Sequence, residues 1–339
     1  MAQAVRKYSN EFMNIGVDAA SLGMANAVTA QTNNVNAGYW NPAGLVQLED
    51  SELALMHASY FANIAQYDYA AFAKPIDDRS AWGISLIRFG VDDILNTTQL
   101  IDNQGNIDYN RISLFSTADY GITFSYARKL PVPGLQYGVN AKVIRRIIGD
   151  FASSWGFGLD FGVQFERNGW NFGLMLRDIT TTYNVWNINE EKFQEIANAI
   201  PGENQDLPET TEITLPKAQL GVSKKFTFNY DYSLTAAAKL NMRFEQTNDI
   251  ISSSLVSIDP AIGFEFGYTD MVFLRVGVGN FQNVRQLDGR ESVAFQPNIG
   301  LGFRYKGIQI DYALTDIGDQ SVALYSNIFS LRIDLGIFR

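Results

Sequence analysis

The chain has 339 residues, 46% of them hydrophobic, so it is long enough to bury a large core as one big domain or two ordinary ones. Its 26 Lys and Arg residues against 36 Asp and Glu residues give a formal net charge of -10, which argues against general binding to nucleic-acid phosphates. The absence of cysteine excludes thiolate catalysis and cysteine zinc sites, and a single histidine argues against histidine triads and multi-histidine metal sites. We therefore expect no enzymatic activity, no cofactor and no metal site.

Residues 1–50 are rich in Ala, Gly and Asn and carry several large apolar side chains but few charges. The segment is too apolar for a solvated tail and too irregular for strands, so we expect a hatch tucked inside a barrel. Its turn motif is Asn41, Pro42, Ala43, Gly44 and Leu45, because proline restricts the residue before it and cannot donate to a ladder. The apolar residues that either anchor this hatch or line a cavity for a hydrophobic ligand are Phe12, Met13, Leu22, Met24 and Trp40.

Residues 51–339 read as strands with a period of two. In residues 154–166 one face is bulky and apolar, as at Trp155 and Phe157, while the other is small or polar, as at Gly156 and Asp160. A nearly unbroken apolar face opposite a face rich in glycine fits contact with lipid outside and a lumen inside. We count about fourteen strands, within two, and predict an all-β fold: a 14-stranded antiparallel transmembrane β-barrel with an N-terminal hatch. A soluble sandwich is the weaker alternative, since its outer face would be heavily charged.

The connections between these strands alternate in length. Short turns such as Asn168 and Asn229-Tyr230 alternate with long loops such as 91–113 and 181–213, a pattern typical of bacterial outer-membrane barrels. It predicts an outer-membrane protein with both termini on the periplasmic, short-turn side. Aromatic residues expected in the interfacial girdles, where they would meet outer-membrane lipid, are Tyr60, Tyr67, Tyr120, Tyr126, Tyr137, Trp155, Trp170, Tyr268 and Tyr305.

The longest loop, 181–213, predicts a short helix over residues 189–200 that packs across the extracellular mouth. It either docks a protein partner or simply folds down on itself. The residues expected to contact such a partner are Trp186, Phe193, Ile196 and Ile200.

Charged residues at lumen-facing positions have mixed signs, and we expect them to pair with one another and to hold the hatch and barrel rigid. They include Lys142, Asp160, Glu166, Arg177, Arg243, Glu245, Glu265, Arg275, Arg304, Asp311, Arg332 and Asp334. Arg145 and Arg146 lie near a strand end, where they would be ordinary solvated charges or would contact a lipopolysaccharide head group. His57 shares the lipid-facing parity of Leu53 and Leu55, which suits an interfacial side chain.

Two stretches of the N-terminal segment resemble a known family. The run from Lys7 to Val28 and the run from Tyr39 to Leu45 resemble the PorV/PorQ outer-membrane proteins, a branch of the FadL-like barrels associated with type IX secretion. The resemblance is specific over the first 45 residues and rests on strand number and topology beyond them.

The resemblance implies two functions. PorV-like members act with a large translocon and bind exported cargo through extracellular loops, which implies a protein partner in a secretion complex. FadL-like members bind a hydrophobic small molecule in the lumen and release it sideways through the barrel wall. The first is our leading hypothesis, the second is the alternative, and a purely structural barrel is the third.

Overall fold

The computed structural model describes residues 9–60, 64–101, 104–199, 209–285, 289–315 and 326–338. Within these ranges the chain forms one continuous antiparallel sheet preceded by a short helical segment. Among the described residues no helix is both long and apolar enough to span a membrane.

Fourteen of the described strands follow one another around a closed ring. Each long strand pairs with its neighbours in the chain, and β1 pairs both with β2 and with the last strand, β17, so that the ring has no free edge. The predicted 14-stranded antiparallel barrel is therefore confirmed. The ring consists of β1 (Glu52–Tyr60), β2 (Ala65–Asp77), β3 (Ser80–Asn96), β4 (Ser113–Lys129), β5 (Leu135–Ile148), β6 (Ala152–Arg167), β7 (Trp170–Arg177), β10 (Lys217–Phe228), β11 (Tyr232–Arg243), β13 (Ser257–Tyr268), β14 (Val272–Arg285), β15 (Glu291–Tyr305), β16 (Ile308–Thr315) and β17 (Ser326–Asp334).

Three shorter strands extend this ring on the side of the long loops: β8 (Thr182–Ile188), β9 (Thr211–Thr214) and β12 (Ile251–Ser252). β8 pairs with the first half of β6, and β9 pairs with β8, so the wall continues beyond β7 and β10. On the other side the strands are joined by tight turns. Asn168 and Gly169 both have positive φ, 53° and 74°, as a two-residue hairpin turn requires.

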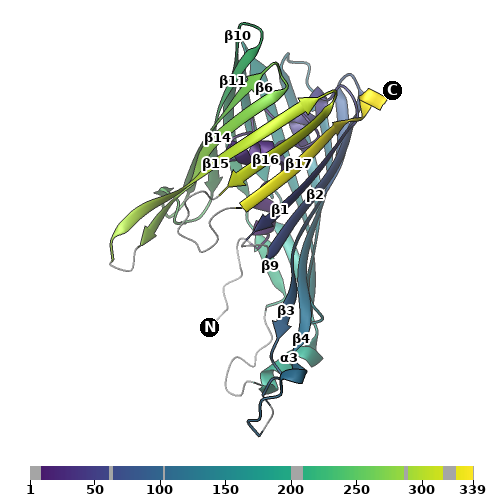
Figure 1. Cartoon of the computed structure of the whole chain (residues 1–339), viewed down its shortest axis with the longest axis vertical. Helices are drawn as coiled ribbons and strands as arrows, with labels where there is room; N and C mark the ends of the chain where they lie inside the picture. Colours follow the sequence, from purple (N-terminus) through teal and green to yellow (C-terminus); the bar gives the residue numbers. More distant parts are fainter. Residues whose placement is uncertain are drawn as a thin grey trace.

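Helix α3 (Glu190–Ala199) lies between β8 and β9. The residue before it, Asn189, donates from its backbone N–H to Phe151 and from its side chain to Asp150, both in the β5–β6 turn. Figure 1 places the helix near the far ends of β3 and β4. The expected position across the mouth is thus wrong, because β8 and β9 carry the helix outward along the extended wall.

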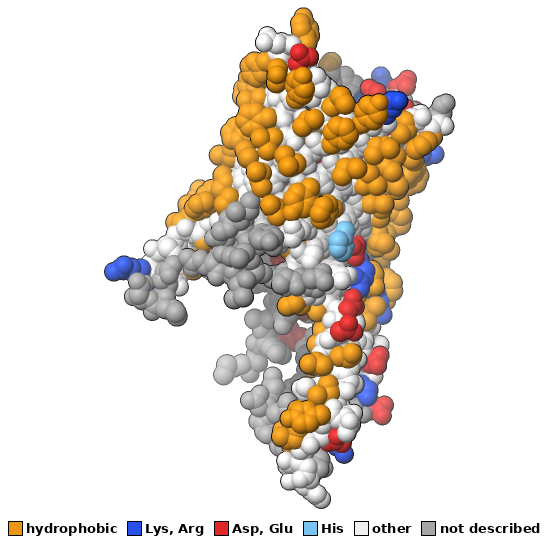
Figure 2. Space-filling model, viewed as in Figure 1, with side chains coloured by type: hydrophobic (Ala, Val, Ile, Leu, Met, Phe, Trp, Pro, Cys, Tyr) orange, Lys and Arg blue, Asp and Glu red, His pale blue; other side chains and the backbone are white. Residues whose placement is uncertain are grey.

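The outer face of the ring is apolar over its short-turn half (Figure 2). Trp170, Tyr268 and Tyr305 are exposed there, as expected for girdle residues. Trp155 is also exposed, but it lies at the long-loop end of β6, opposite Val185 of β8. Tyr60 and Tyr67 are instead buried inside, because the inward positions of β1 are even-numbered and those of β2 odd-numbered.

His57 marks the lower limit of this apolar surface, on the outer face of β1. Its side chain is 55% exposed, and its Nδ1 lies 2.7 Å from Asp68 on β2. Below this level β3 and β4 continue as strands of 17 residues each, well beyond the ~9–11 residues that a bilayer requires. The apolar band and the extension together give the barrel a membrane half and a projecting half.

The N-terminal segment, residues 9–50, lies inside the ring (Figure 1). It contains η1 (Glu11–Asn14), α1 (Ala19–Gly23), α2 (Ala37–Trp40) and η2 (Pro42–Gln47). Its contacts go all around the barrel: α1 packs against β14 to β17, whereas η2 packs against β2 to β6. Because the segment touches both halves of the wall, it spans the lumen.

Candidate functional site

Asn41 fixes the N-terminal segment to the wall of the barrel. Its side-chain oxygen accepts from the Ala43 N–H and so caps η2. Its Nδ2 lies 3.0 Å from the Val163 carbonyl on β6, 3.3 Å from the Leu174 carbonyl on β7, and 3.1 Å from the Thr29 carbonyl of the segment itself. The residue is fully buried. One amide thus joins two barrel strands to two parts of the segment.

Glycines in the wall make room for this contact. A Cβ added to Gly138 on β5 would overlap the backbone of Pro42 and Ala43, and one added to Gly162 on β6 would overlap the Asn41 side chain. Within the segment, a Cβ on Gly44 would overlap the Thr32 carbonyl. The five residues of the predicted motif, Asn41 to Leu45, are all buried, and the first three lie against wall positions where only glycine leaves enough room.

The five apolar residues predicted as hatch anchors or ligand contacts are all at least 94% buried, but they do not form one group. Met13 packs on Gly121 of β4, with Phe12 beside it. Met24 packs on Gly263 and Gly277 of β13 and β14. Of the five, only Leu22 and Trp40 line the loop-side cavity described below.

Tyr39 and Arg177 connect α2 to β7. The Tyr39 hydroxyl donates to the Met13 carbonyl at 2.9 Å, and Arg177 donates to the Tyr39 carbonyl at 2.9 Å while its Cζ lies 4.6 Å from the Tyr39 ring. Burial raises the pKa of the Tyr39 hydroxyl, an effect that the positive charge of Arg177 partly offsets. The hydroxyl therefore remains a neutral donor over the physiological range.

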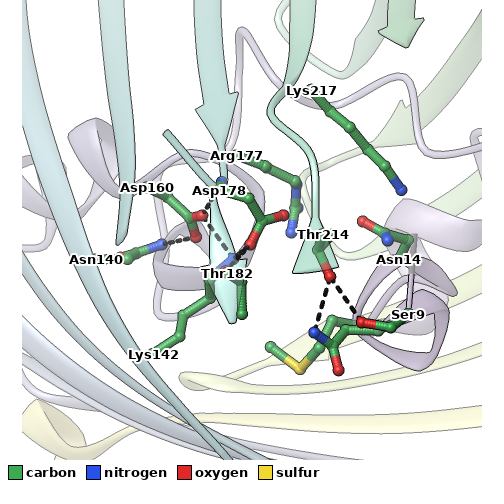
Figure 3. Close-up of polar contacts among 12 residues, drawn as sticks. Ser9, Asn14, Asn140, Lys142, Asp160, Arg177, Asp178, Thr182, Thr214 and Lys217 are labelled. Carbon is green, nitrogen blue, oxygen red and sulfur yellow. Dashed lines mark hydrogen bonds and ion pairs between the residues drawn. The ribbon is translucent and has the colours of Figure 1, made fainter. Parts of the chain in front are cut away.

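Buried ion pairs brace the wall next to this contact (Figure 3). Lys142 Nζ lies 2.7 Å from Asp160 and 2.6 Å from Asp178, and Thr182 Oγ1 donates to Asp178. Across the barrel, Arg275 lies 2.6 Å from both Glu265 and Asp311. Of the predicted lumen charges, Lys142, Asp160, Glu265, Arg275 and Asp311 thus form buried pairs, and pairs this closely hydrogen-bonded are costly to break.

Arg146 also belongs to this internal network. Its guanidinium contacts Asp119 at 3.0 Å and Glu212 at 3.3 Å, and donates to the Ser9 carbonyl. It is therefore not a solvated charge and does not face a lipid head group. Arg145 lies on the opposite face, with its Cζ 4.9 Å from the Trp155 ring.

A cavity of about 430 Å³, the loop-side chamber, lies between the N-terminal segment and strands β7, β10, β11, β13, β14 and β15. Trp40, Tyr39 and Leu22 give it an apolar floor, whereas the strands contribute amide and charged side chains. Among the described residues that line it, cations outnumber carboxylates: Arg177, Lys217, Lys239 and Arg243 face it against Glu11 and Asp259.

A second cavity of about 510 Å³, the short-turn chamber, lies on the other side of the N-terminal segment. Among its described lining residues the sign of the charge is reversed. Its carboxylates and cations are Glu49, Asp50, Glu52, Glu265, Asp270 and Asp334 against Lys225, Arg304 and Arg332. The segment thus separates an electropositive chamber from an electronegative one.

The loop-side chamber contains residues that the sequence did not single out, namely Lys217, Lys239 and Asp259. A signal was present for Lys239, because Ala237, Lys239, Asn241 and Arg243 alternate with outward residues along β11. Which of these positions border a cavity depends on how the N-terminal segment packs, which strand parity does not reveal.

The residues predicted for a partner-binding loop are not brought together in one place. Trp186 on β8 packs over Arg146, and the Arg146 Cζ lies 5.2 Å from the centre of the Trp186 ring. Phe193 lies on α3. The Ile196 side chain and Ile200 lie outside the described residues.

In the described part of the chain no group of three His, Cys, Asp or Glu side chains has the arrangement of a metal site.

Neither a protein-family model nor a curated protein matches this chain. Solved structures do match. The toluene transporter TodX of Pseudomonas putida is similar over 94% of this chain and 98% of its own, with a TM-score of 0.59 at 12% identity. A FadL homologue of Pseudomonas aeruginosa has a TM-score of 0.53 at 14% identity over 94% and 98% of the two chains. The toluene transporter TbuX of Ralstonia pickettii has a TM-score of 0.54 at 11% identity over the same shares. The chain therefore has the fold of the FadL-like barrels.

Proposed function

We propose that this chain is an outer-membrane channel for small hydrophobic or amphipathic molecules, with the N-terminal segment as its plug and both termini in the periplasm. The observation that carries this proposal is the placement of the segment. It spans the lumen of a closed barrel and has a chamber on either side, as a gate between two compartments would. The names of the similar structures, two toluene transporters and a FadL homologue, support it.

Passage through the lumen requires the plug to move, and the chain offers a direct way to test this. A Cβ built on Gly38 of α2 would lie 3.7 Å from the Cβ of Ser125 on β4, a distance suited to a disulfide. The natural chain has no cysteine that would compete. Gly38→Cys with Ser125→Cys therefore fastens the plug to the wall reversibly.

The measurement is uptake of radiolabelled toluene and of a long-chain fatty acid by Gram-negative cells that lack their own carrier. We expect the natural chain to raise uptake above the vector control. Oxidation of the double-cysteine variant should abolish the gain and a reductant should restore it, with Ser125→Cys alone as the matched control. Equal uptake by natural chain and vector would refute the proposed function, and uptake through the oxidised variant would refute the gating role of the plug.

A second function, docking of a protein partner in type IX secretion, is favoured by the exposed apolar residues of the projecting half. Leu95, Ile107, Tyr109 and Leu114 are 57–72% exposed on the β3–β4 hairpin, beyond the apolar band. Such residues grouped on a projection are typical of an interaction surface. The similar structures name no secretion component, so this reading rests on the resemblance of the first 45 residues and on this surface.

A gentle detergent pull-down with mass spectrometry separates the two functions. Recovery of a very large barrel or of secreted cargo, lost on Leu95→Ser with Leu114→Ser, supports partner docking. The matched control is Leu220→Ser on the membrane half, which should not change recovery. Recovery of small molecules without any protein partner would support the channel function and contradict partner docking.

A further inference from the structure

The loop-side chamber is too polar for a simple hydrocarbon. Arg177, Lys239, Gln219 and Asn298 line it, and each of these side chains is at least 92% buried. A hydrocarbon placed here would displace water from these groups without replacing its hydrogen bonds, which costs binding energy.

One buried cation in this chamber lacks a close counter-charge. Among the described residues Lys239 has no carboxylate within ion-pair distance, and its Nζ lies 5.8 Å from the centre of the Trp40 ring. Its neighbours are already engaged: Lys217 lies 2.7 Å from Glu11, and Arg243 lies 3.9 Å from Asp249. Lys239 is therefore the group most suited to receive an anion from outside.

Hydrogen-bond acceptors surround the same space. Side-chain oxygens of Asn26, Gln219, Asn241 and Asn298 are buried and have no hydrogen-bond partner among the described residues. All four residues line the chamber. Buried polar atoms are normally paired, so a ligand with hydroxyl donors complements this ring of amides.

The apolar part of the chamber is aromatic and short. Tyr39, Trp40 and Tyr60 contribute rings, while the remaining apolar side chains are few and small or branched. A flat ring stacks on such a surface, whereas a long alkyl chain would lie along the amides and leave them unpaired.

From these three features we propose that the loop-side chamber binds a hydroxylated aromatic carboxylate, with the carboxylate at Lys239, the ring at Trp40 and the hydroxyl at the amide oxygens. This inference rests on the proposed channel function, because it names the class of amphipathic molecule that enters the channel first. It gives the excess of cations in this chamber a role that a hydrocarbon substrate would not require.

The test is isothermal titration of the full-length chain in detergent with 4-hydroxybenzoate, benzoate, toluene and laurate as probes. We expect 4-hydroxybenzoate to bind most tightly. Lys239→Gln should weaken it at least tenfold, Lys239→Arg should retain most of the affinity, and Asn241→Leu should reduce it to the level of benzoate. Lys306→Gln, at an exposed turn on the other side of the barrel, is the matched control and should not change binding.

Different results separate this inference from the channel function. Equal binding to the natural chain and Lys239→Gln, or tighter binding of laurate or toluene than of 4-hydroxybenzoate, would overturn the inference even if toluene uptake is observed. Binding of 4-hydroxybenzoate to the chain, without uptake of any of the labelled molecules by the cells, would overturn the channel function. The inferred binding site would still stand. Faster migration of each unboiled variant on a gel verifies that its barrel has formed.

Discussion

Asn41 shows how much a single side chain contributes to holding the plug. It caps η2 and lies within hydrogen-bond distance of three carbonyl groups, two of them on barrel strands. Asn41→Ala removes the cap and leaves buried carbonyls unpaired, so we expect a loss of about 2–4 kcal/mol in the free energy of unfolding. Thermal unfolding in detergent, followed by circular dichroism, measures it. Asn187→Ala, at an exposed position on β8, is the control; an equal effect of both changes would contradict this role.

The buried Tyr39 hydroxyl should make the free energy of unfolding depend on pH in the alkaline range. Because burial raises its pKa in the folded state, the unfolded chain loses this proton first as the pH rises. The stabilisation is complete below the ordinary tyrosine value of 10.0 and is lost as the pH rises from there through the folded-state pKa. Tyr39→Phe should lower stability by about 1 kcal/mol at neutral pH and make the decline above pH 10 shallower. Unfolding curves between pH 8 and about 11 measure both effects, and an unchanged slope in the variant would show that Tyr39 does not titrate in this way.

At the scale of elements, the fit between η2 and β5 predicts a strong effect of one methyl group. Gly138→Ala places its Cβ against the backbone of Pro42 and Ala43, which cannot rotate away, so η2 must shift. We expect a loss of about 1–3 kcal/mol, the usual cost of overpacking, and faster hydrogen exchange in residues 37–47. The matched control is Gly267→Ala, whose Cβ would meet the Ser233 hydroxyl, a side chain that can turn aside. Similar exchange in both variants would mean that the wall does not hold the plug.

The strands of the barrel could be predicted from the sequence, whereas the packing of the plug against them could not. The strands of the ring could be predicted because lipid and lumen impose opposite residue types on alternate positions, as in β6. The inward direction of Tyr60 and Tyr67 could not, because an aromatic side chain suits both an interface and a packed plug. The chamber around Lys239 was also hidden, since it is defined by where α1 and α2 end, and these helices are only five and four residues long.

For the whole molecule, closure of the ring predicts resistance to unfolding. Every ring strand is paired on both sides, so the barrel opens only when many backbone hydrogen bonds break together. An unboiled sample in mild detergent should therefore migrate faster on a gel than a boiled one. Identical migration together with solubility in the absence of detergent would contradict a closed membrane barrel.

The reversal of charge across the plug has an electrical consequence. Two chambers of opposite sign in series, with cations in excess at the loop side and carboxylates at the short-turn side, form the ionic counterpart of a diode. If the plug moves as proposed and the chambers join, we expect mobile anions to gather at one end and mobile cations at the other. Salt then flows more readily under one polarity of voltage than under the other, so single-channel currents in a planar bilayer would rectify and would reveal the orientation of each inserted barrel.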